Sequence, residues 1–287
     1  PEVTTEVKVE VTEPPVTEPP ALGYTTIEMS NTNLYTGSLI LVNAQYAYHF
    51  PTSAASLLTV YNEYVINNYR CNYFDDTSAQ LDATATRNIL ALANALYTET
   101  GLNWLKMGTG YRSYEVQQGL AEKHPTTAAL PGYSEHHTGL GVDLQIWDKE
   151  KRVTYNFDEP NQNCQTIYSW ISANAYKYGY VRRFAPDKDN ITYITSDRWH
   201  YRYVGVPHAY YMTANNLCLE EYLAWLESFT YEGTHLFIND VEGKNYEIYF
   251  VPAENGTSTT LPVPTDPTAY TVSGNNYSGY IVTVTLN

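Results

Sequence analysis

The stretch YSEHHTGLGVDLQIWD, residues 133–148, places two of the chain's seven histidines side by side, followed by two glycines and an aspartate. Its second half, GVDLQIW, alternates apolar and polar residues, as a strand with one buried face does. Val142, Leu144 and Ile146 then share the buried face. Asp143 is therefore expected to point the other way, toward a cleft or solvent.

His136 precedes Asp143 by seven residues, and this odd separation would put the two side chains on opposite faces of one unbroken strand. A turn at Thr138 and Gly139 can bring the histidine back to the same side, and the glycines let the backbone pass close to a bound group. A histidine and a carboxylate that converge in this way can bind a first-row metal ion. The alternative is an ordinary His–Asp hydrogen bond within a turn.

A second stretch, SDRWHYRYVG at residues 196–205, favours the metal site. A catalytic zinc ion commonly has three protein ligands and an open fourth position for water. His136, Asp143 and His200 complete such a set. Asp197, three residues before His200, then remains as a carboxylate that can accept a proton from the attacking water.

A third stretch, MGTGYRSYEVQ at residues 107–117, places Arg112, Ser113 and Gln117 in a loop that enters a helix. The planar guanidinium of Arg112 can neutralise a substrate carboxylate or a developing oxyanion. Serine and cysteine hydrolase mechanisms are disfavoured, because Ser134 has no G-x-S-x-G setting and no cysteine lies near a histidine in these stretches.

The middle of the chain mixes helical and strand patterns. Residues 81–101 predict a helix that begins after Asp82 and ends at Gly101. Further helices are expected at 164–179 and 215–229, and strands at 141–147 and 199–205. The predicted fold class is α+β, an antiparallel sheet with flanking helices that carries a zinc cleft, plus a small C-terminal all-β module.

Composition divides the chain into three regions. Residues 1–22 contain VTEPP twice and too few bulky apolar side chains to fold, which is typical of an extended, Pro-stiffened spacer. From about Tyr231, short β-prone runs alternate with turn residues and indicate a small β module at 231–287. We therefore predict a catalytic domain at 23–230 that folds by itself.

Charge and cysteine content narrow the function further. With 31 acidic and 16 basic residues, a net charge of −15 and no Lys/Arg cluster, the chain lacks a surface for nucleic acid. Cys71, Cys164 and Cys218 are too few and too scattered for a zinc finger or a disulfide scaffold. One disulfide and three free thiols both remain open.

The ordered set GYRSYEVQ, GYSEHHTGLGVD and DRWHYRYVG resembles the VanY-type zinc D-alanyl-D-alanine carboxypeptidases, which are LAS-type peptidoglycan metallopeptidases. Their relatives include L,D-carboxypeptidases and phage peptidoglycan endopeptidases. The family pattern is S-x-H, two residues, G-x-A-x-D and, much later, E-x-W-H. The resemblance extends over roughly residues 25–215, and the matching residues are Ser134, His136, Gly139, Asp143, Trp199 and His200.

The resemblance implies a Zn²⁺ ion held by His136, Asp143 and His200. His136 rather than His137 is the implied ligand, because the family's histidine lies two residues after the serine. The domain at 23–230 is then a zinc carboxypeptidase domain.

The resemblance also implies roles around the metal. Arg112 would stabilise the oxyanion or the terminal carboxylate of the substrate, and Asp197 stands where the family has its catalytic glutamate. Ser134 and Gln117 would line the pocket for the terminal D-Ala, and the expected substrate contacts are Ser134, Gln117, Trp199 and Ser113.

Three positions depart from the family. Gly141 replaces an alanine, which is a small change. Asp197 is one methylene shorter than glutamate, so unless the backbone moves inward its carboxylate stands farther from the water that it must activate. Phe184 occupies a place where relatives often have a hydroxylated aromatic residue, which removes one substrate hydrogen bond.

Two functions follow as hypotheses. The first is an exported enzyme that removes the C-terminal D-Ala from peptidoglycan stem peptides, with D,D, L,D and endopeptidase preference left open. The alternative is a zinc-containing wall-binding protein with weak or no activity because of Asp197. The expected partners are peptidoglycan stem peptides, and the protein is expected to be a monomer. It is expected outside the cell at the envelope, with a membrane or wall tether beyond the given sequence.

Overall fold

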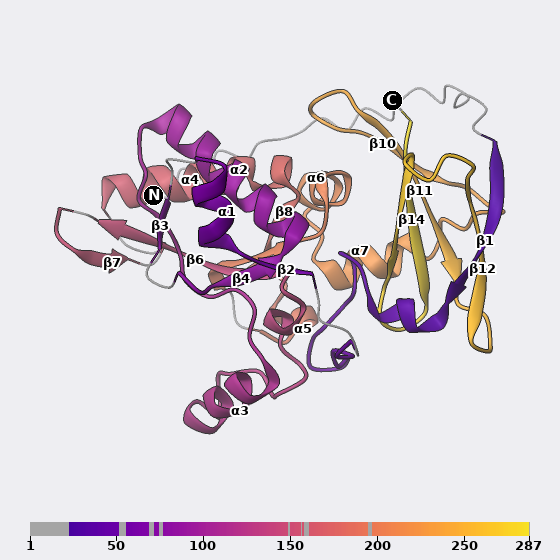
Figure 1. Cartoon of the computed structure of the whole chain (residues 1–287), viewed down its shortest axis with the longest axis horizontal. Helices are drawn as coiled ribbons and strands as arrows, with labels where there is room; N and C mark the ends of the chain where they lie inside the picture. The colour runs from indigo at the N-terminus through magenta and orange to yellow at the C-terminus, as the bar shows by residue number, and fades with distance from the viewer. Residues whose placement is uncertain are drawn as a thin grey trace.

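The computed structural model describes residues 23–51, 56–68, 72–74, 77–148, 150–155, 157, 161–194 and 197–286. The spacer predicted at residues 1–22 and Cys71 lie outside these ranges. Cys164 and Cys218 are buried, and no disulfide joins these two residues. Helices surround a central sheet in one part of the molecule, and strands dominate the other part (Figure 1).

The central sheet is built around β6 (Gly141–Asp148), the strand that the alternating stretch predicts. The strand order is β3-β5-β6-β9-β8, and β7 also pairs with β6. Every pair is antiparallel except β3 with β5, so the predicted antiparallel sheet is correct for most pairs. The other strands are β3 (Asn72–Phe74), β5 (Leu105–Met107), β7 (Val153–Tyr155), β8 (Tyr180–Phe184) and β9 (Asp197–Tyr203).

The long helix predicted at 81–101 is confirmed as α2 (Ala83–Thr100). Asp82 caps it by accepting hydrogen bonds from two backbone N–H groups of the first turn. It ends at Gly101, whose φ of 72° is a conformation that glycine adopts readily. Its buried side chains include Ile89, Leu92 and Leu96.

The other two predicted helices form with changed bounds. The helix predicted at 164–179 is α4 (Gln162–Asn174) followed by η3 (Ala175–Tyr178). The one predicted at 215–229 is the shorter α7 (Leu219–Leu226), because Asn216 with φ 51° separates it from α6 (Val206–Ala214). The sequence did not predict α6. The remaining short elements are η1 (Asn31–Tyr35), β2 (Leu57–Thr59), α1 (Val60–Ile66), β4 (Gln80–Asp82), α3 (Tyr114–Lys123), η2 (Glu135–Thr138) and α5 (Asp189–Thr192).

The C-terminal part forms a β unit. One sheet has the order β10-β11-β14-β13, and β1 pairs with β12 beside it (Figure 1). The strands are β10 (Leu236–Asn239), β11 (Asn245–Pro252), β12 (Ser258–Pro264), β13 (Tyr270–Gly274), β14 (Gly279–Thr285) and β1 (Tyr24–Ser30).

Residues 24–30 were predicted to belong to the catalytic domain at 23–230, and the structure instead places them, as β1, with the C-terminal strands. This strand belongs to the β unit, where it pairs antiparallel with β12 over seven residues, from Tyr24 opposite Pro264 to Ser30 opposite Ser258. An isolated strand of this length cannot satisfy its backbone groups, and β12 supplies the missing hydrogen bonds.

The β unit and the helical part share one hydrophobic core. Leu223 and Leu226 of α7 pack in the same buried cluster as Ile248 of β11 and Ile281 of β14. His208 of α6 joins the two parts by hydrogen bonds to the Tyr222 hydroxyl at 2.8 Å and the Thr283 hydroxyl at 2.9 Å. The cut predicted at residue 230 passes through this core.

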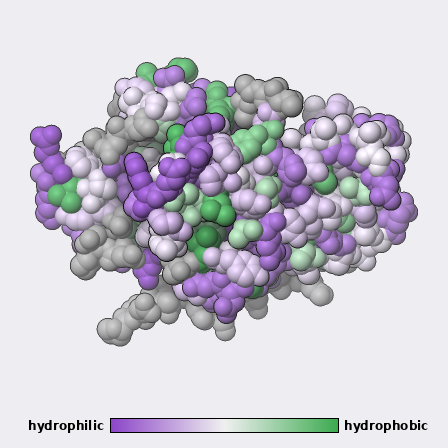
Figure 2. Space-filling view, turned by 90° about the horizontal axis from the view of Figure 1, so that it is seen from below, coloured by the Kyte–Doolittle hydropathy of each residue, from purple (hydrophilic) through white to green (hydrophobic). Residues whose placement is uncertain are grey.

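The surface seen from below is mostly hydrophilic, with hydrophobic residues gathered near the middle of that face (Figure 2). This agrees with the net charge of −15. No described helix has both the length and the apolar character needed to cross a membrane.

We expect a fragment of residues 23–230 to fail to fold, contrary to the expectation from sequence. It keeps β1 without β12 and exposes the face of α6 and α7 that packs on β11 and β14. The fragment and the full chain should be compared by soluble yield and by cooperative urea unfolding. A soluble fragment with a cooperative transition would restore the original boundaries.

His208 predicts a pH dependence of stability. Burial lowers its pKa from 6.5 to about 3. Between these values the unfolded chain binds a proton that the folded protein does not, so the free energy of unfolding decreases as the pH falls below 6.5, by about 1.4 kcal/mol per pH unit. The stability advantage of wild type over His208→Gln should shrink from about pH 6.5 to about pH 4.5 in urea titrations. If the difference in unfolding free energy between wild type and His208→Gln did not change with pH, the lowered pKa of His208 would be wrong.

Candidate active site

A cavity of about 560 Å³ collects almost all residues that the sequence singled out. It lies between η2, the start of β6, the start of β9, and α3 with the loop that follows it. Its lining includes Arg112, Gln117, Ser134, His136, Asp143, Asp197, Trp199 and His200. Ser113 is absent from the lining; its hydroxyl instead caps α3 by accepting a hydrogen bond from the backbone N–H of Val116.

The three expected metal ligands come together from two adjacent strands and one turn. Asp143 of β6 lies opposite His200 of β9 in the sheet register. His136 sits in η2, which ends at Gly139 with φ 71°, so the predicted turn is present. One ligand atom from each of these three side chains lies within 4.8 Å of the other two.

Gly141, which stands where the family pattern has alanine, packs closely against His200. A Cβ atom at residue 141 would lie 3.1 Å from both Cε1 and Nε2 of the His200 imidazole. An alanine here would therefore press on that ring, and glycine lets the ring lie closer to the strand.

The contacts of His136 are compatible with a cation between it and Asp143. The Nδ1 atom of His136 lies 2.7 Å from the carbonyl oxygen of Gly110 and must donate a hydrogen to it, since a carbonyl can only accept. In the neutral ring, Nε2 then carries a lone pair, and it faces Asp143 Oδ2 at 3.4 Å. Burial lowers the pKa of His136, which favours this neutral form. Tetrahedral zinc with bonds of about 2.1 Å separates its ligand atoms by about 3.4 Å.

His200 is held between two carboxylates. Its Nδ1 lies 2.9 Å from Asp143 Oδ1, and its Nε2 lies 3.2 Å from Glu135 Oε2. Burial acts to lower the pKa of His200, but the hydrogen bonds to Asp143 and Glu135 outweigh it and raise the pKa to about 9. Burial likewise acts to raise the pKa of Asp143, and His136 and His200 bring it below its ordinary value. A metal ion at Nδ1 would replace the proton there, with Glu135 orienting the ring from behind.

Asp197 stands at the edge of this group. Its Oδ1 accepts hydrogen bonds from the backbone N–H groups of Trp199 at 2.8 Å and His200 at 3.0 Å. No described residue donates a hydrogen bond to Oδ2, which leaves that oxygen for water or substrate. Burial raises the pKa of Asp197 above its ordinary value.

Arg112 lines the cavity beside Asp143. Its Nη2 donates to Asp143 Oδ2 at 3.2 Å, and its Nη1 donates to Gln117 Oε1 at 3.1 Å. Gln117 is buried and its amide donates to the Ala129 carbonyl at 2.7 Å. Gln117 therefore orients the guanidinium as well as lining the cavity.

His137 supports Arg112 from behind. It is fully buried, Nδ1 donates to the Arg112 carbonyl at 2.7 Å, and Nε2 accepts from the Gly132 backbone N–H at 3.0 Å. Both ring nitrogens are thus used by the backbone, which agrees with His136 as the ligand. Phe184 lines the cavity with its ring 5.1 Å from that of His200.

Glu135 is the site residue that the sequence did not reveal. It is buried, and its Oε1 accepts from Arg183 Nε at 2.7 Å and from Arg202 Nη1 at 2.9 Å. Burial acts to raise the pKa of Glu135, but these two arginines hold it below its ordinary value. Arginines inside the apolar strands YVRRF and HYRYV were the available signal, because such cations require a buried carboxylate partner.

Three candidate metal ligands beside a carboxylate and an arginine in one cavity form an arrangement that is typical of metal-dependent hydrolases. The family model of VanY, D-alanyl-D-alanine carboxypeptidase, matches residues 78–206. A D-alanyl-D-alanine carboxypeptidase of Enterococcus faecium is 31% identical over 254 residues, covering 88% of this chain and 76% of the relative. The chain belongs to the VanY family of D-alanyl-D-alanine carboxypeptidases.

Solved structures show the same likeness. The vancomycin resistance D,D-dipeptidase VanXYg, in complex with a D-Ala-D-Ala phosphinate analog, has a TM-score of 0.75 and 26% identity. The alignment covers 92% of this chain and 99% of that one, so it extends beyond the predicted catalytic domain. The LD-carboxypeptidase LdcB, whose structure concerns peptidoglycan recognition, has a TM-score of 0.51 and 28% identity over 64% of this chain and 84% of that one.

The geometry predicts graded effects on metal binding. Glu135→Gln should keep the metal but weaken its affinity by about 10- to 100-fold, because the side chain behind the ligand His200 loses its charge. His200→Ala should abolish binding, and His137→Ala should leave the affinity near wild type. Competition with a chromophoric chelator measures all three. Equal loss of metal in the His200→Ala and His137→Ala variants would contradict the choice of His136 rather than His137 as the ligand.

Proposed function

We propose that this protein is a zinc-dependent carboxypeptidase that removes the C-terminal D-Ala from peptidoglycan stem peptides. The observation that carries the proposal is that His136 Nε2 and Asp143 Oδ2, each with a lone pair, face each other at 3.4 Å. Both atoms belong to side chains that line a cavity together with Asp197 and Arg112. Membership of the VanY family and the likeness to a D,D-dipeptidase bound to a D-Ala-D-Ala analog support this substrate class.

His136, Asp143 and His200 would hold the zinc ion. When bound, zinc supplies a Lewis acid that polarises the peptide carbonyl and makes water a better nucleophile at neutral pH. Glu135 and the Gly110 carbonyl keep the two imidazoles in the orientation that ligation needs.

The remaining steps belong to the chain's own side chains. Asp197 accepts the proton of the attacking water at Oδ2, since Oδ1 is held by two backbone N–H groups. It then returns the proton to the leaving amine of D-Ala. Arg112, oriented by Gln117, neutralises the terminal carboxylate or the developing oxyanion. Ser134 and Trp199 line the same cavity and complete the substrate contacts.

The second candidate function is binding of wall peptides with little hydrolysis. It is favoured by Asp197, which is one methylene shorter than the family's glutamate and has one oxygen fixed to the start of β9. In either function we place the protein outside the cell at the envelope, as the Pro/Glu-rich segment of residues 1–22 and the peptidoglycan substrate suggest.

Release of free D-Ala from synthetic stem pentapeptide and tetrapeptide tests the proposal. Pentapeptide turnover indicates D,D activity and tetrapeptide turnover indicates L,D activity. Loss of turnover on zinc removal, with recovery on zinc addition, is expected for either preference.

Asp197→Asn should retain full zinc while its kcat falls by about 10²- to 10⁴-fold, because the amide cannot accept the proton. Asp197→Glu is the matched variant and should keep or raise kcat. If wild type, Asn and Glu forms all hydrolyse at one slow rate with full zinc, Asp197 is not a base and the binding function is the correct one.

A further inference from the structure

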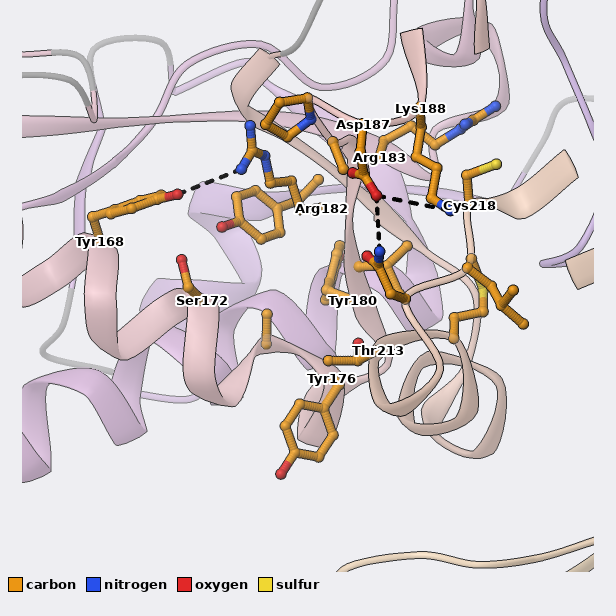
Figure 3. A pocket seen from close by; sticks show the side chains of 18 residues that line it. Tyr168, Ser172, Tyr176, Tyr180, Arg182, Arg183, Asp187, Lys188, Thr213 and Cys218 are labelled. Carbon is orange, nitrogen blue, oxygen red and sulfur yellow. Dashed lines mark hydrogen bonds and ion pairs between the residues drawn. The ribbon is translucent and has the colours of Figure 1, made fainter. Parts of the chain in front are cut away.

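A second cavity, of about 320 Å³, lies away from the metal site at the outer edge of β8, the last strand in the sheet order. It is bounded by α4 and η3 on one side and by the end of α6 and the loop after β8 on the other (Figure 3). Its volume is at the lower end of the roughly 300–1,000 Å³ typical of small-molecule sites. No role described so far uses this cavity.

The cavity contains a buried polar group with no partner. Tyr201 follows His200 on β9 and is 1% exposed, and the described residue that its hydroxyl faces is Ser172. The two hydroxyls do not meet the geometry of a hydrogen bond, and no other described residue pairs with the Tyr201 hydroxyl. An unpaired buried hydroxyl costs about 1–3 kcal/mol, whereas phenylalanine would fill the same space without that cost. The hydroxyl can therefore bind a ligand or a water molecule that enters the cavity.

Other donors surround the same side of the cavity. Tyr168 and Ser172 of α4 direct their hydroxyls toward the space that Arg182 also lines (Figure 3). Arg182 Nη1 donates to the Tyr168 hydroxyl at 3.5 Å, and its Nε donates to the Asp197 carbonyl at 3.1 Å. Arg198 lies over the Tyr168 ring at 5.6 Å. Hydroxyl groups beside guanidinium groups suit a carboxylate.

The opposite side of the cavity carries an acidic group. Asp187 accepts from the Asn216 amide at 2.8 Å, and Lys188 lies 3.9 Å from it. Lys188 also pairs with Glu221 at 2.9 Å, so it neutralises the charge of Asp187 only in part. Figure 3 shows Asp187 across the cavity from Tyr168 and Ser172. A small molecule that carries both a carboxylate and an ammonium group has a partner for each of them among these residues.

We infer that this cavity is a second binding site, specific for a free α-amino acid. The carboxylate of the ligand accepts hydrogen bonds from Tyr201, Ser172 and Arg182, and its ammonium group meets Asp187. The choice of D-alanine as the probe rests on the proposed function, of which D-alanine is the product. Because Arg182 also holds the carbonyl of Asp197, the ligand contacts the strand that carries the catalytic carboxylate.

Methyl NMR can test this site separately from the active site. The chain has three methionines, and Met212 lines the second cavity while Met29 is on β1 and Met107 is on β5. In zinc-loaded full-length protein labelled at the methionine methyls, D-alanine should shift the Met212 signal saturably and leave Met29 unchanged. D-Alaninamide, which lacks the carboxylate, should shift Met212 at least about tenfold more weakly, as loss of a charge-assisted contact implies.

Two variants complete the experiment. Tyr201→Phe should abolish the saturable Met212 shift and leave the melting temperature unchanged. If the hydroxyl instead stabilised the fold, its removal would lower the melting temperature. Arg112→Gln, which changes only the metal-site cavity, should leave the Met212 shift as in wild type. A Met212 signal that never moves means that water alone partners Tyr201, and equal binding by the amide or by Tyr201→Phe also overturns the inference. Hydrolysis of stem peptides tests the proposed function separately, because its outcome does not depend on these shifts.

Discussion

One buried ion cluster determines how the active site is held. Glu135 accepts hydrogen bonds from Arg183 and Arg202, and Glu220 of α7 pairs with the other side of Arg183 at 2.6 Å. Taking charges out of water is costly unless each has partners with good geometry, and removing one partner of such a group costs about 3–5 kcal/mol. The cluster therefore permits few alternative positions for η2, β8, β9 and α7, since each of them contributes a charge.

The same cluster also holds the candidate metal site in place. The second oxygen of Glu135 reaches His200, so the charges that join four elements also orient one candidate ligand. Glu220 lies on α7, and α7 packs on the β unit through a shared core. The β unit thus supports the helical part through α7, and the likeness to VanXYg likewise covers 92% of this chain rather than the motifs of the cavity alone.

Features that depend on short sequence distances were predictable, and features that depend on distant partners were not. The strand β6, the helix α2 and the grouping of His136 with Asp143 follow from local alternation, capping and spacing. The pairing of β1 with β12 joins segments more than 200 residues apart, and no local pattern indicates it. Glu135 was missed for the same reason, because its arginine partners lie 48 and 67 residues away. The α6 helix lacks a polar stripe because it is buried on several sides.

The position of Asp197 shows why side-chain length alone does not decide where this carboxylate lies in the cavity. The pairing of β8 with β9 is irregular between Arg182 and Phe184, and Phe184 is the residue opposite Asp197. A bulge bends the strand and turns side chains from their regular directions, and bulges are frequent next to active sites. Asp197 also lies at the start of β9, where Arg182 binds its carbonyl and its own Oδ1 caps two backbone N–H groups. The change from glutamate to aspartate therefore falls where the backbone itself departs from regular pairing, so the reach of Oδ2 depends on the local path of β9 as much as on the missing methylene.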